Sequence, residues 1–120
     1  MTQFVRPNHL IPEDQLACWI AQIALGLDYL HNQANIIHRD IKLQNILVMK
    51  NGLLKLADFG ISRKLFPEDF AKTSLGTPYN LAPEIVEHSK YDYKADIWSF
   101  GCMLSELCCS EKPFYGKSVK

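Results

Sequence analysis

Two polar segments with chemically active side chains flank a short apolar stretch near the middle of the chain. The first runs from His38 to Asn45 (HRDIKLQN), and the second, Asp58 to Gly60 (DFG), begins thirteen positions after Asn45. Asp40, Asn45 and Asp58 supply carboxylate and amide oxygens. Such oxygens suit a hard cation such as Mg²⁺, which takes a few of them together with substrate phosphates. The spacing therefore indicates a magnesium site.

The stretch between these segments predicts a β-hairpin. Two apolar runs, Ile46 to Met49 and Leu53 to Leu56, stand on either side of Asn51-Gly52. An Asn-Gly pair is typical of a two-residue type I′ turn, which needs positive φ at both central positions. In that register residues whose numbers sum to 103 are paired, so Asn45 would face Asp58 at about 4.5–5.5 Å. The hairpin would then hold an amide and a carboxylate together at its end.

These segments resemble a known family. The pattern HRDxKxxN followed by DFG is similar to the catalytic signature of eukaryotic protein kinases. Two more blocks of that family follow in the same order, Gly76 to Glu84 (GTPYNLAPE) and Asp96 to Gly101 (DIWSFG). Four ordered blocks rarely coincide by chance. The segments Phe70 to Thr73 and Asp96 to Leu107 are most similar to NIMA-related kinases.

The resemblance implies roles for the polar residues. Asp40 would accept or orient the proton of the substrate hydroxyl, and Lys42 would lie beside the transferred phosphate. Asn45 and Asp58 would hold Mg²⁺ bridging the phosphates of ATP, with Lys42 also contributing to nucleotide binding. Lys42, two positions after Asp40, is the pattern of Ser/Thr kinases rather than tyrosine kinases. Leu47, and Ile46 and Val48 less directly, would form the floor beneath the adenine, and the same residues are also expected to form a buried strand.

The segment from Ile61 to Leu81 is predicted to be a loop, and its length matches the kinase activation segment. By resemblance, Arg39 pairs with a phosphate on this segment, which would order the loop. Thr73 is the first candidate for that phosphate and Ser74 the second, although Thr73 could also be an ordinary polar loop residue. Thr77 would hydrogen-bond the catalytic carboxylate and lysine and favour a Ser/Thr-type substrate.

Three positions leave alternatives or departures from the family. Asn80 stands where the family usually has an aromatic residue, with Tyr79 just before it, so the wall of the substrate pocket is open to question. Glu84 pairs in the family with an arginine near the end of the domain, and a buried carboxylate without its partner costs about 3–5 kcal/mol. His38 could be a metal ligand or, as the resemblance implies, a packing residue against Phe59.

Two helices are predicted to position these segments. The first begins at Pro12 and ends near His31-Asn32, with an apolar stripe that Trp19 and Ala24 widen: Leu16, Ile20, Ile23, Leu27 and Leu30. Gly26 in this helix would permit close packing against a neighbour. A short strand, Ile36-Ile37, leads from this helix into His38.

The second helix spans Tyr93 to Cys109 and is almost continuously apolar. Its buried candidates are Ala95, Trp98, Cys102, Leu104 and Leu107. The resemblance makes it the family's central helix, in which Asp96 braces the backbone of the catalytic loop. The four cysteines show no metal or redox spacing, and Cys108 and Cys109 are predicted to be core thiols.

The expected fold is α+β, a protein-kinase-like architecture that is mainly helical with one short hairpin. A complete kinase domain is about twice this length. No glycine-rich loop and no strand lysine precede His38. We therefore expect residues 1–120 to be a partial kinase domain, its C-lobe core, without the N-lobe and the last C-lobe helices.

Composition limits the environment and the partners. The chain has 120 residues, 13 Lys and Arg against 13 Asp and Glu, and 48% hydrophobic residues. This balance fits one soluble globular unit and gives no basic excess for nucleic acid or an anionic membrane. The charged and proline-containing first twenty residues predict neither a signal peptide nor a membrane helix. A cytoplasmic protein is expected, with the nucleus as an alternative.

The leading functional hypothesis is a protein serine/threonine kinase that uses ATP and Mg²⁺ and modifies protein substrates, with an upstream activating kinase as a further partner. The 120 residues alone are expected to be inactive. A second hypothesis is a non-catalytic truncated lobe that only binds partners. A third is a small-molecule phosphotransferase, which the block from Gly76 to Glu84 and the central helix disfavour, since these build a platform for protein substrates.

Overall fold

The computed structural model describes residues 1–4, 11–64 and 78–114. In this part the chain forms three α-helices, two two-stranded antiparallel sheets and several short helical turns. In chain order the elements are a 3₁₀ turn (Thr2–Phe4), α1 (Glu13–Asp28), a π turn (Tyr29–Gln33), β1 (Ile36–Ile37), a 3₁₀ turn (Leu43–Asn45), β2 (Ile46–Val48), β3 (Leu54–Leu56), β4 (Arg63–Lys64), a 3₁₀ turn (Pro78–Asn80), α2 (Pro83–Val86) and α3 (Lys94–Cys109).

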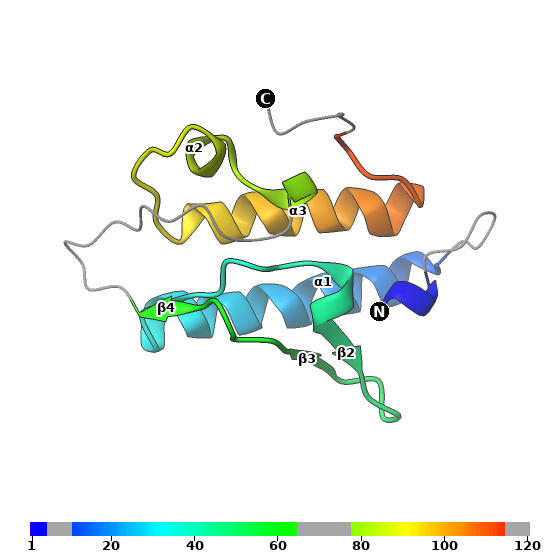
Figure 1. The fold of residues 1–120 in the computed structure, drawn as a ribbon. Helices are drawn as coiled ribbons and strands as arrows, with labels where there is room; N and C mark the ends of the chain where they lie inside the picture. Colours follow the sequence, from blue (N-terminus) through cyan, green and yellow to red (C-terminus); the bar gives the residue numbers. More distant parts are fainter. Residues whose placement is uncertain (5–10, 65–77, 115–120) are drawn as a thin grey trace.

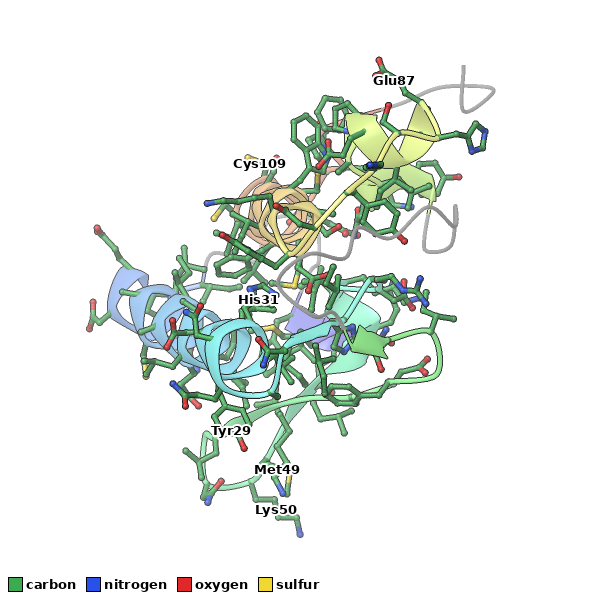
Figure 2. All side chains as sticks on the ribbon, turned by 90° about the vertical axis from the view of Figure 1, so that its left-hand side faces the viewer. Tyr29, His31, Met49, Lys50, Glu87 and Cys109 are labelled. Carbon is green, nitrogen blue, oxygen red and sulfur yellow. The ribbon has the colours of Figure 1, made fainter. Side chains whose placement is uncertain are left out.

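The long helices α1 and α3 lie alongside each other, and the segment from residue 38 to residue 42 passes between them (Figure 1). The hairpin of β2 and β3 lies on the side of α1 away from α3, and α2 lies beyond α3. In the view turned by 90°, Met49 and Lys50 mark the hairpin tip, far from Cys109 at the end of α3 (Figure 2). The predicted mainly helical α+β character is therefore confirmed.

Helix α1 forms where the apolar periodicity predicts it. Pro12 is its N-cap residue, and Glu13 and Asp14 place negative charge in the first turn, where it suits the helix dipole. The helix buries Trp19, Ile23 and Leu27, and Leu30 follows in the π turn. Leu16 and Ile20 are half-buried, whereas Ala24 is exposed and does not widen the buried face as predicted.

Gly26 lies at the contact between α1 and the hairpin. A Cβ atom at this position would come within 3.2 Å of Cδ1 of Leu56 on β3. That separation is shorter than most Cβ contacts, so a larger residue here would require the Leu56 side chain to shift by a few tenths of an ångström. The prediction of close packing at Gly26 is confirmed.

The hairpin exists, but its predicted turn and register are wrong. Ile46 pairs with Leu56, Leu47 with Lys55 and Val48 with Leu54, so paired numbers sum to 102 rather than 103.

The difference comes from the turn. The amide of Gly52 donates to the carbonyl of Met49 at 3.0 Å, and Gly52 has a φ of 82°. Asn51 has negative φ, so the loop contains three residues, the last of them in the left-handed region. An extra loop residue shifts the pairing by one position. Asn45 therefore lies opposite Ala57, whose amide donates to the Asn45 carbonyl at 2.8 Å, rather than opposite Asp58.

A second sheet joins two distant segments. Ile36 pairs with Lys64 and Ile37 with Arg63, antiparallel. The strand at Ile36–Ile37 was predicted, whereas Arg63–Lys64 lies in the segment predicted as a loop. This pairing ties the start of that segment to the residues that lead into His38.

Helix α3 also matches its predicted range. Ala95, Cys102 and Leu107 are buried as expected, and burial raises the pKa of the Cys102 thiol. Trp98 is instead 39% exposed and stacks on Phe114, with ring centroids 5.7 Å apart and planes at 8°.

The adjacent thiols near the end of α3 do not lie where the sequence predicts them. Cys108 and Cys109 are exposed and not in the core. A nearly all-apolar helix offers no polar face from which its exposed side could be predicted.

The segment from His38 to Asn45, called the catalytic segment after its predicted role, is itself part of the core. Ile41 and Leu43 are 1% and 0% exposed. They join a cluster drawn from the first residue of the chain, both long helices and the hairpin: Met1, Trp19, Ile23, Leu27, Ile46, Met103 and Leu107. A smaller cluster contains Ile37, Ala82, Ile85, Tyr91 and Ala95. Packing in both clusters thus holds the segment at alternate positions and fixes the polar residues between them.

Helix α2 ends in a Schellman motif whose left-handed position is occupied by His88. The amide of His88 donates to the Ile85 carbonyl at 3.1 Å, the amide of Ser89 donates to the Glu84 carbonyl at 2.9 Å, and His88 has a φ of 55°. Glycine adopts this conformation without the Cβ penalty.

We expect His88→Gly to raise the free energy of unfolding by about 0.5–1 kcal/mol, because relief of the left-handed strain exceeds the entropy that glycine adds to the unfolded chain. Chemical denaturation measures the change. His88→Ala keeps the Cβ atom and is the matched control. Equal stability of the two variants would contradict the prediction.

Candidate active site

Asp96, in the first turn of α3, holds the backbone at the start of the catalytic segment. One of its oxygens accepts the amide of Arg39 and the other accepts the amide of His38, both at 2.8 Å. The second oxygen also lies 2.8 Å from Nε2 of His31. Asp96 is 1% exposed, so these bonds form away from water. The predicted bracing role of Asp96 is confirmed, whereas nothing in the sequence reading pointed to His31.

His38 is a packing residue. Its side chain is fully buried, its ring lies 4.8 Å from the ring of Phe59 between centroids, and its Nε2 is 3.1 Å from the Ala57 carbonyl oxygen. Its Nδ1 accepts the amide of Asp40 at 3.4 Å. Both ring nitrogens therefore have partners within the protein. This arrangement joins the catalytic segment to the residues around Asp58 and favours packing over a metal-ligand role.

Three predicted site residues come together around one carboxylate. Lys42 Nζ donates to Oδ2 of Asp40 at 2.5 Å, and Asn45 Nδ2 donates to the same oxygen at 2.9 Å. The Asn45 amide also donates to the Asp40 carbonyl oxygen at 2.8 Å. Asp40 is 8% exposed, and a bond to an ammonium group is among the stronger hydrogen bonds. The carboxylate is thus held in one orientation beside a positive charge.

Asp58 comes two positions after Leu56, the last paired residue of β3, and is exposed to solvent. Its φ of 63° is unusual for a residue with a side chain, and its Oδ1 accepts the amide of Gly60 at 3.2 Å. Non-glycine residues in this conformation cluster at functional sites. The carboxylate is therefore accessible to a ligand, as a metal-binding group must be.

The donor set fits a hard cation. Asn45 and Asp58 offer amide and carboxylate oxygens at one end of the hairpin, and Mg²⁺ in proteins usually takes one or two such ligands and keeps several waters or phosphates. In residues 1–4, 11–64 and 78–114 no group of three or more His, Cys, Asp or Glu side chains could hold a metal. The described residues therefore contain no metal site formed only by these four side-chain types.

Strand β2 presents neighbouring residues to opposite sides. Ile46 is fully buried in the core, whereas Leu47 is 49% exposed. The alternation of side chains along a strand produces this difference. Leu47 is therefore a strand residue, as predicted, but the prediction that it is buried is wrong, and its apolar surface is available to a ligand.

Arg39, like Asp58, has a backbone in the left-handed region, with a φ of 69°. Its Nε donates to the Ile61 carbonyl oxygen, and its Nη1 donates to the hydroxyl of Tyr91 at 3.3 Å. Arg39 thus reaches the beginning of the predicted activation segment. The other predicted residues of that segment, Thr73, Ser74 and Thr77, lie outside the described residues.

Near the end of the predicted activation segment, Asn80 is buried and bonded to the catalytic segment. Its Nδ2 donates to the carbonyl oxygen of Ile41 at 3.1 Å, and its own carbonyl accepts the hydroxyl of Ser99 at 2.7 Å. Glu84 is half-buried rather than buried, so the predicted cost of an unpaired carboxylate is reduced. No sequence signal identified Ser99.

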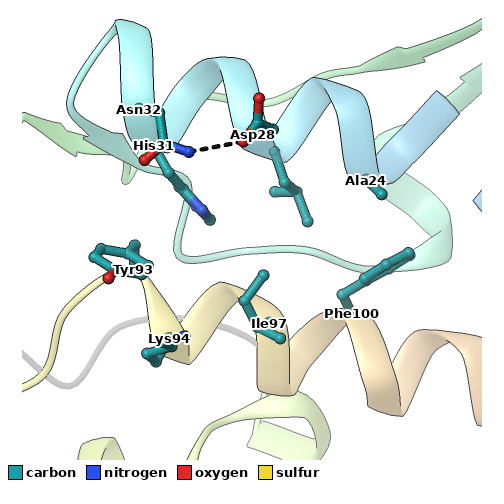
Figure 3. Close-up of a pocket in the computed structure, with 9 residues that line it drawn as sticks. Ala24, Asp28, His31, Asn32, Tyr93, Lys94, Ile97 and Phe100 are labelled. Atoms are coloured by element: carbon teal, nitrogen blue, oxygen red, sulfur yellow. Dashed lines mark hydrogen bonds between the residues drawn. The ribbon is translucent and has the colours of Figure 1, made fainter. Parts of the chain in front are cut away.

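A groove of about 260 Å³ opens between α1 and α3 (Figure 3). Asp28, which accepts a hydrogen bond from Asn32 at 2.7 Å, lines it together with His31 and Ile97. None of the predicted site residues lines this groove. The candidate active site is thus the surface around Asp40 and Asp58.

Within the described part of the chain, no helix is both long enough and apolar enough to cross a membrane.

Comparison with known proteins identifies the family of this chain. The profile of the protein kinase domain matches residues 1–120. The chain belongs to the protein kinase family. Protein kinases as a family use ATP as the phosphoryl donor, typically with Mg²⁺, and a protein as the acceptor.

Relatives place the resemblance more narrowly. The chain is 50% identical over 113 residues to serine/threonine-protein kinase Nek5 of Homo sapiens, which covers 92% of this chain and 16% of the relative. It is 43% identical over 117 residues to Nek11 of Homo sapiens (97% and 18%) and 47% identical over 112 residues to Nek3 of Mus musculus (92% and 22%). The predicted similarity to NIMA-related kinases is confirmed. The chain spans about a sixth of the length of the first of these relatives.

Proposed function

We propose that this chain supplies the catalytic loop and metal ligands of a protein serine/threonine kinase, which transfers the γ-phosphoryl group of ATP to Ser and Thr hydroxyls of protein substrates. The observation that carries the proposal is the contact among Asp40, Lys42 and Asn45, with the accessible carboxylate of Asp58 at the same end of the hairpin.

Each residue has a task that its position supports. Asp40 accepts or orients the proton of the substrate hydroxyl, which requires a carboxylate held in a fixed direction. Lys42, bonded to that carboxylate, places a positive charge beside the transferred phosphate. Asn45 and Asp58 hold Mg²⁺, which neutralises charge on the ATP phosphates when bound. Thr77 lies outside the described residues, and its task, a hydroxyl that favours Ser/Thr substrates, is assigned from the resemblance alone.

Leu47 supplies the apolar surface beneath the adenine, and its half-exposed side chain supports this role. We propose that residues 1–120 form the core of a kinase C-lobe, whose nucleotide site is completed by an N-lobe. The 120 residues alone should turn over ATP negligibly, because Leu47 and Asp58 lie on an open surface.

Control by phosphorylation forms a separate part of the proposal. Thr73, and Ser74 as the second candidate, would accept a phosphate from an upstream kinase, and Arg39 would pair with it. Arg39 already bonds to Ile61 and Tyr91, so the phosphate would join an existing set of contacts.

Net charge and composition support the remaining assignments. A formal charge of zero favours protein substrates over nucleic acid or a membrane surface as partners. We assign the protein to the cytoplasm, with the nucleus as the alternative.

The experiment is a chimera in which this chain replaces the matching segment of human Nek5. We expect the chimera to phosphorylate Ser and Thr in a protein substrate and not Tyr. Asp40→Asn should lower kcat by about 10²–10⁴-fold, because the variant cannot accept the hydroxyl proton. Radiolabel transfer from ATP measures the rate.

Asp14→Asn removes an exposed carboxylate in the first turn of α1 and is the matched control, with kcat expected to be unchanged. A folded chimera without transfer would contradict the proposal and favour a non-catalytic lobe that binds partners. A chimera whose rate survives Asp40→Asn would also contradict it.

A further inference from the structure

Asn80 is a buried polar residue whose side chain is hydrogen-bonded to the catalytic segment. The residue is 7% exposed and lies in the 3₁₀ turn Pro78–Asn80. Its amide nitrogen reaches 39 positions back along the chain to the carbonyl oxygen of Ile41, at 3.1 Å. A buried amide is stable when such a bond is made and costly when it is not. Asn80 is therefore a buried hydrogen-bond donor and not a polar residue that faces solvent.

The same residue is anchored on its other side to α3. The hydroxyl of Ser99, itself 7% exposed, donates to the backbone carbonyl of Asn80 at 2.7 Å. Ser99 lies three residues after Asp96, one turn further along the same helix. Asp96 holds the amides of His38 and Arg39. Helix α3 is therefore connected to the catalytic segment at two points, one direct and one through Asn80.

The acceptor carbonyl belongs to the residue between Asp40 and Lys42. The Ile41 side chain is 1% exposed in the main core, which limits the rotation of this residue. A hydrogen bond to its carbonyl oxygen fixes the peptide plane that joins Ile41 to Lys42. The direction in which Lys42 leaves the backbone, and thus its 2.5 Å contact with Asp40, depends on that plane.

We propose that Asn80 is a positioning residue that acts through the Ile41 carbonyl to hold the Asp40–Lys42 pair in its reactive arrangement. The positioning itself does not depend on the proposed function; only the use of the Asp40–Lys42 pair in catalysis rests on it. The neighbouring Tyr79, 44% exposed with Lys112 Nζ lying 3.8 Å from its ring centroid, presents the aromatic surface of this turn instead. The amide of Asn80 points into the protein and Tyr79 lies at its surface.

The test uses NMR spectroscopy of the full chain, with Asn80→Leu as the main variant. Leucine has nearly the same shape as asparagine, carries no charge and cannot donate a hydrogen bond. We expect shifts in the ¹³C resonance of the Ile41 carbonyl, in the ¹³Cγ resonance of Asp40 and in the ¹⁵N resonance of Lys42 Nζ. The amide resonances of His38 and Arg39, which Asp96 holds separately, should change much less.

Two further variants keep the result decisive. Asn80→Gln retains an amide donor and should restore the Asp40 and Lys42 resonances toward their original positions, which a purely space-filling role would not predict. Ser99→Ala loosens Asn80 without altering it and should move the same resonances in the same direction by a smaller amount. This variant carries the test if Asn80→Leu does not fold.

The matched control is Asn32→Leu, at an exposed asparagine in the π turn after α1, which should leave all three resonances in place. A folded Asn80→Leu with unchanged Ile41, Asp40 and Lys42 resonances would overturn the inference, as would equal changes in the control. Because this measurement needs no phosphate transfer, an inactive Nek5 chimera would count against the proposed function and not against the role of Asn80.

Discussion

Asp96→Ala is expected to lower the free energy of unfolding by about 3–5 kcal/mol, the largest effect on stability of any single change considered for this chain. The carboxylate is 1% exposed and bonds to the amides of His38 and Arg39 and to the ring of His31. Its removal leaves buried donors without an acceptor, and each such donor costs about 1–3 kcal/mol. Chemical denaturation followed by circular dichroism measures the loss.

Asp96→Asn separates the lost charge from the lost shape. Its side-chain oxygen can still accept one backbone amide, so its stability should lie between those of the alanine variant and the original chain. Asp14→Ala, at an exposed position in the first turn of α1, is the control and should change stability by less than about 1 kcal/mol. If Asp96→Ala were no less stable than this control, the role of Asp96 as the brace of the catalytic segment would be wrong.

Asp58→Asn should have the opposite profile, a large loss of catalysis with little loss of stability. Asp58 is exposed and contributes to neither core cluster, and asparagine tolerates its φ of 63°. The variant lacks the negative charge that would hold Mg²⁺. In the chimera with human Nek5, kcat should fall by about 10²-fold or more.

Glu111→Gln removes an exposed carboxylate just after α3 and should leave the rate unchanged. If Asp58→Asn instead unfolded the chain, Asp58 would be a structural residue. If it kept full activity, Asp58 would not be a metal ligand.

The long helices could be predicted from the spacing of their apolar residues, which in α1 gather on one buried face. The stripe of α1 ends where its buried face ends, and the charged first turn marks its start. Exposure along α3 could not be predicted in the same way. Trp98 and Cys108 are exposed on a helix with apolar residues on every side, so only the arrangement of neighbouring elements decides which of them meets solvent.

The hairpin shows how a correct signal can give a wrong register. Asn51-Gly52 correctly marks the turn, but the same pair suits both a two-residue and a three-residue loop, because each needs a left-handed glycine. The structure has the second, and in that register Leu56 packs closely against Gly26 of α1. The one-residue shift moved the partner of Asn45 from Asp58 to Ala57.

The candidate site was predictable in composition and only partly in geometry. Motif spacing identified Asp40, Lys42 and Asn45, which the structure brings together. The hydrogen bond from Asn80 to Ile41 could not be foreseen, because a polar residue in place of an aromatic one signals a difference without naming its new partner.

The most direct test of the metal–nucleotide site is paramagnetic line broadening by Mn²⁺ and ATP, measured by NMR on the chimera with human Nek5. Mn²⁺ prefers the same oxygen ligands as Mg²⁺ and broadens the signals of nuclei close to it. The site predicts that the signals of Asn45 and Asp58 broaden first, well before those of the exposed Glu87, and that Asp58→Asn removes the effect. Broadening centred on Glu87 or another surface carboxylate, with Asn45 and Asp58 unaffected, would contradict the proposed catalytic site.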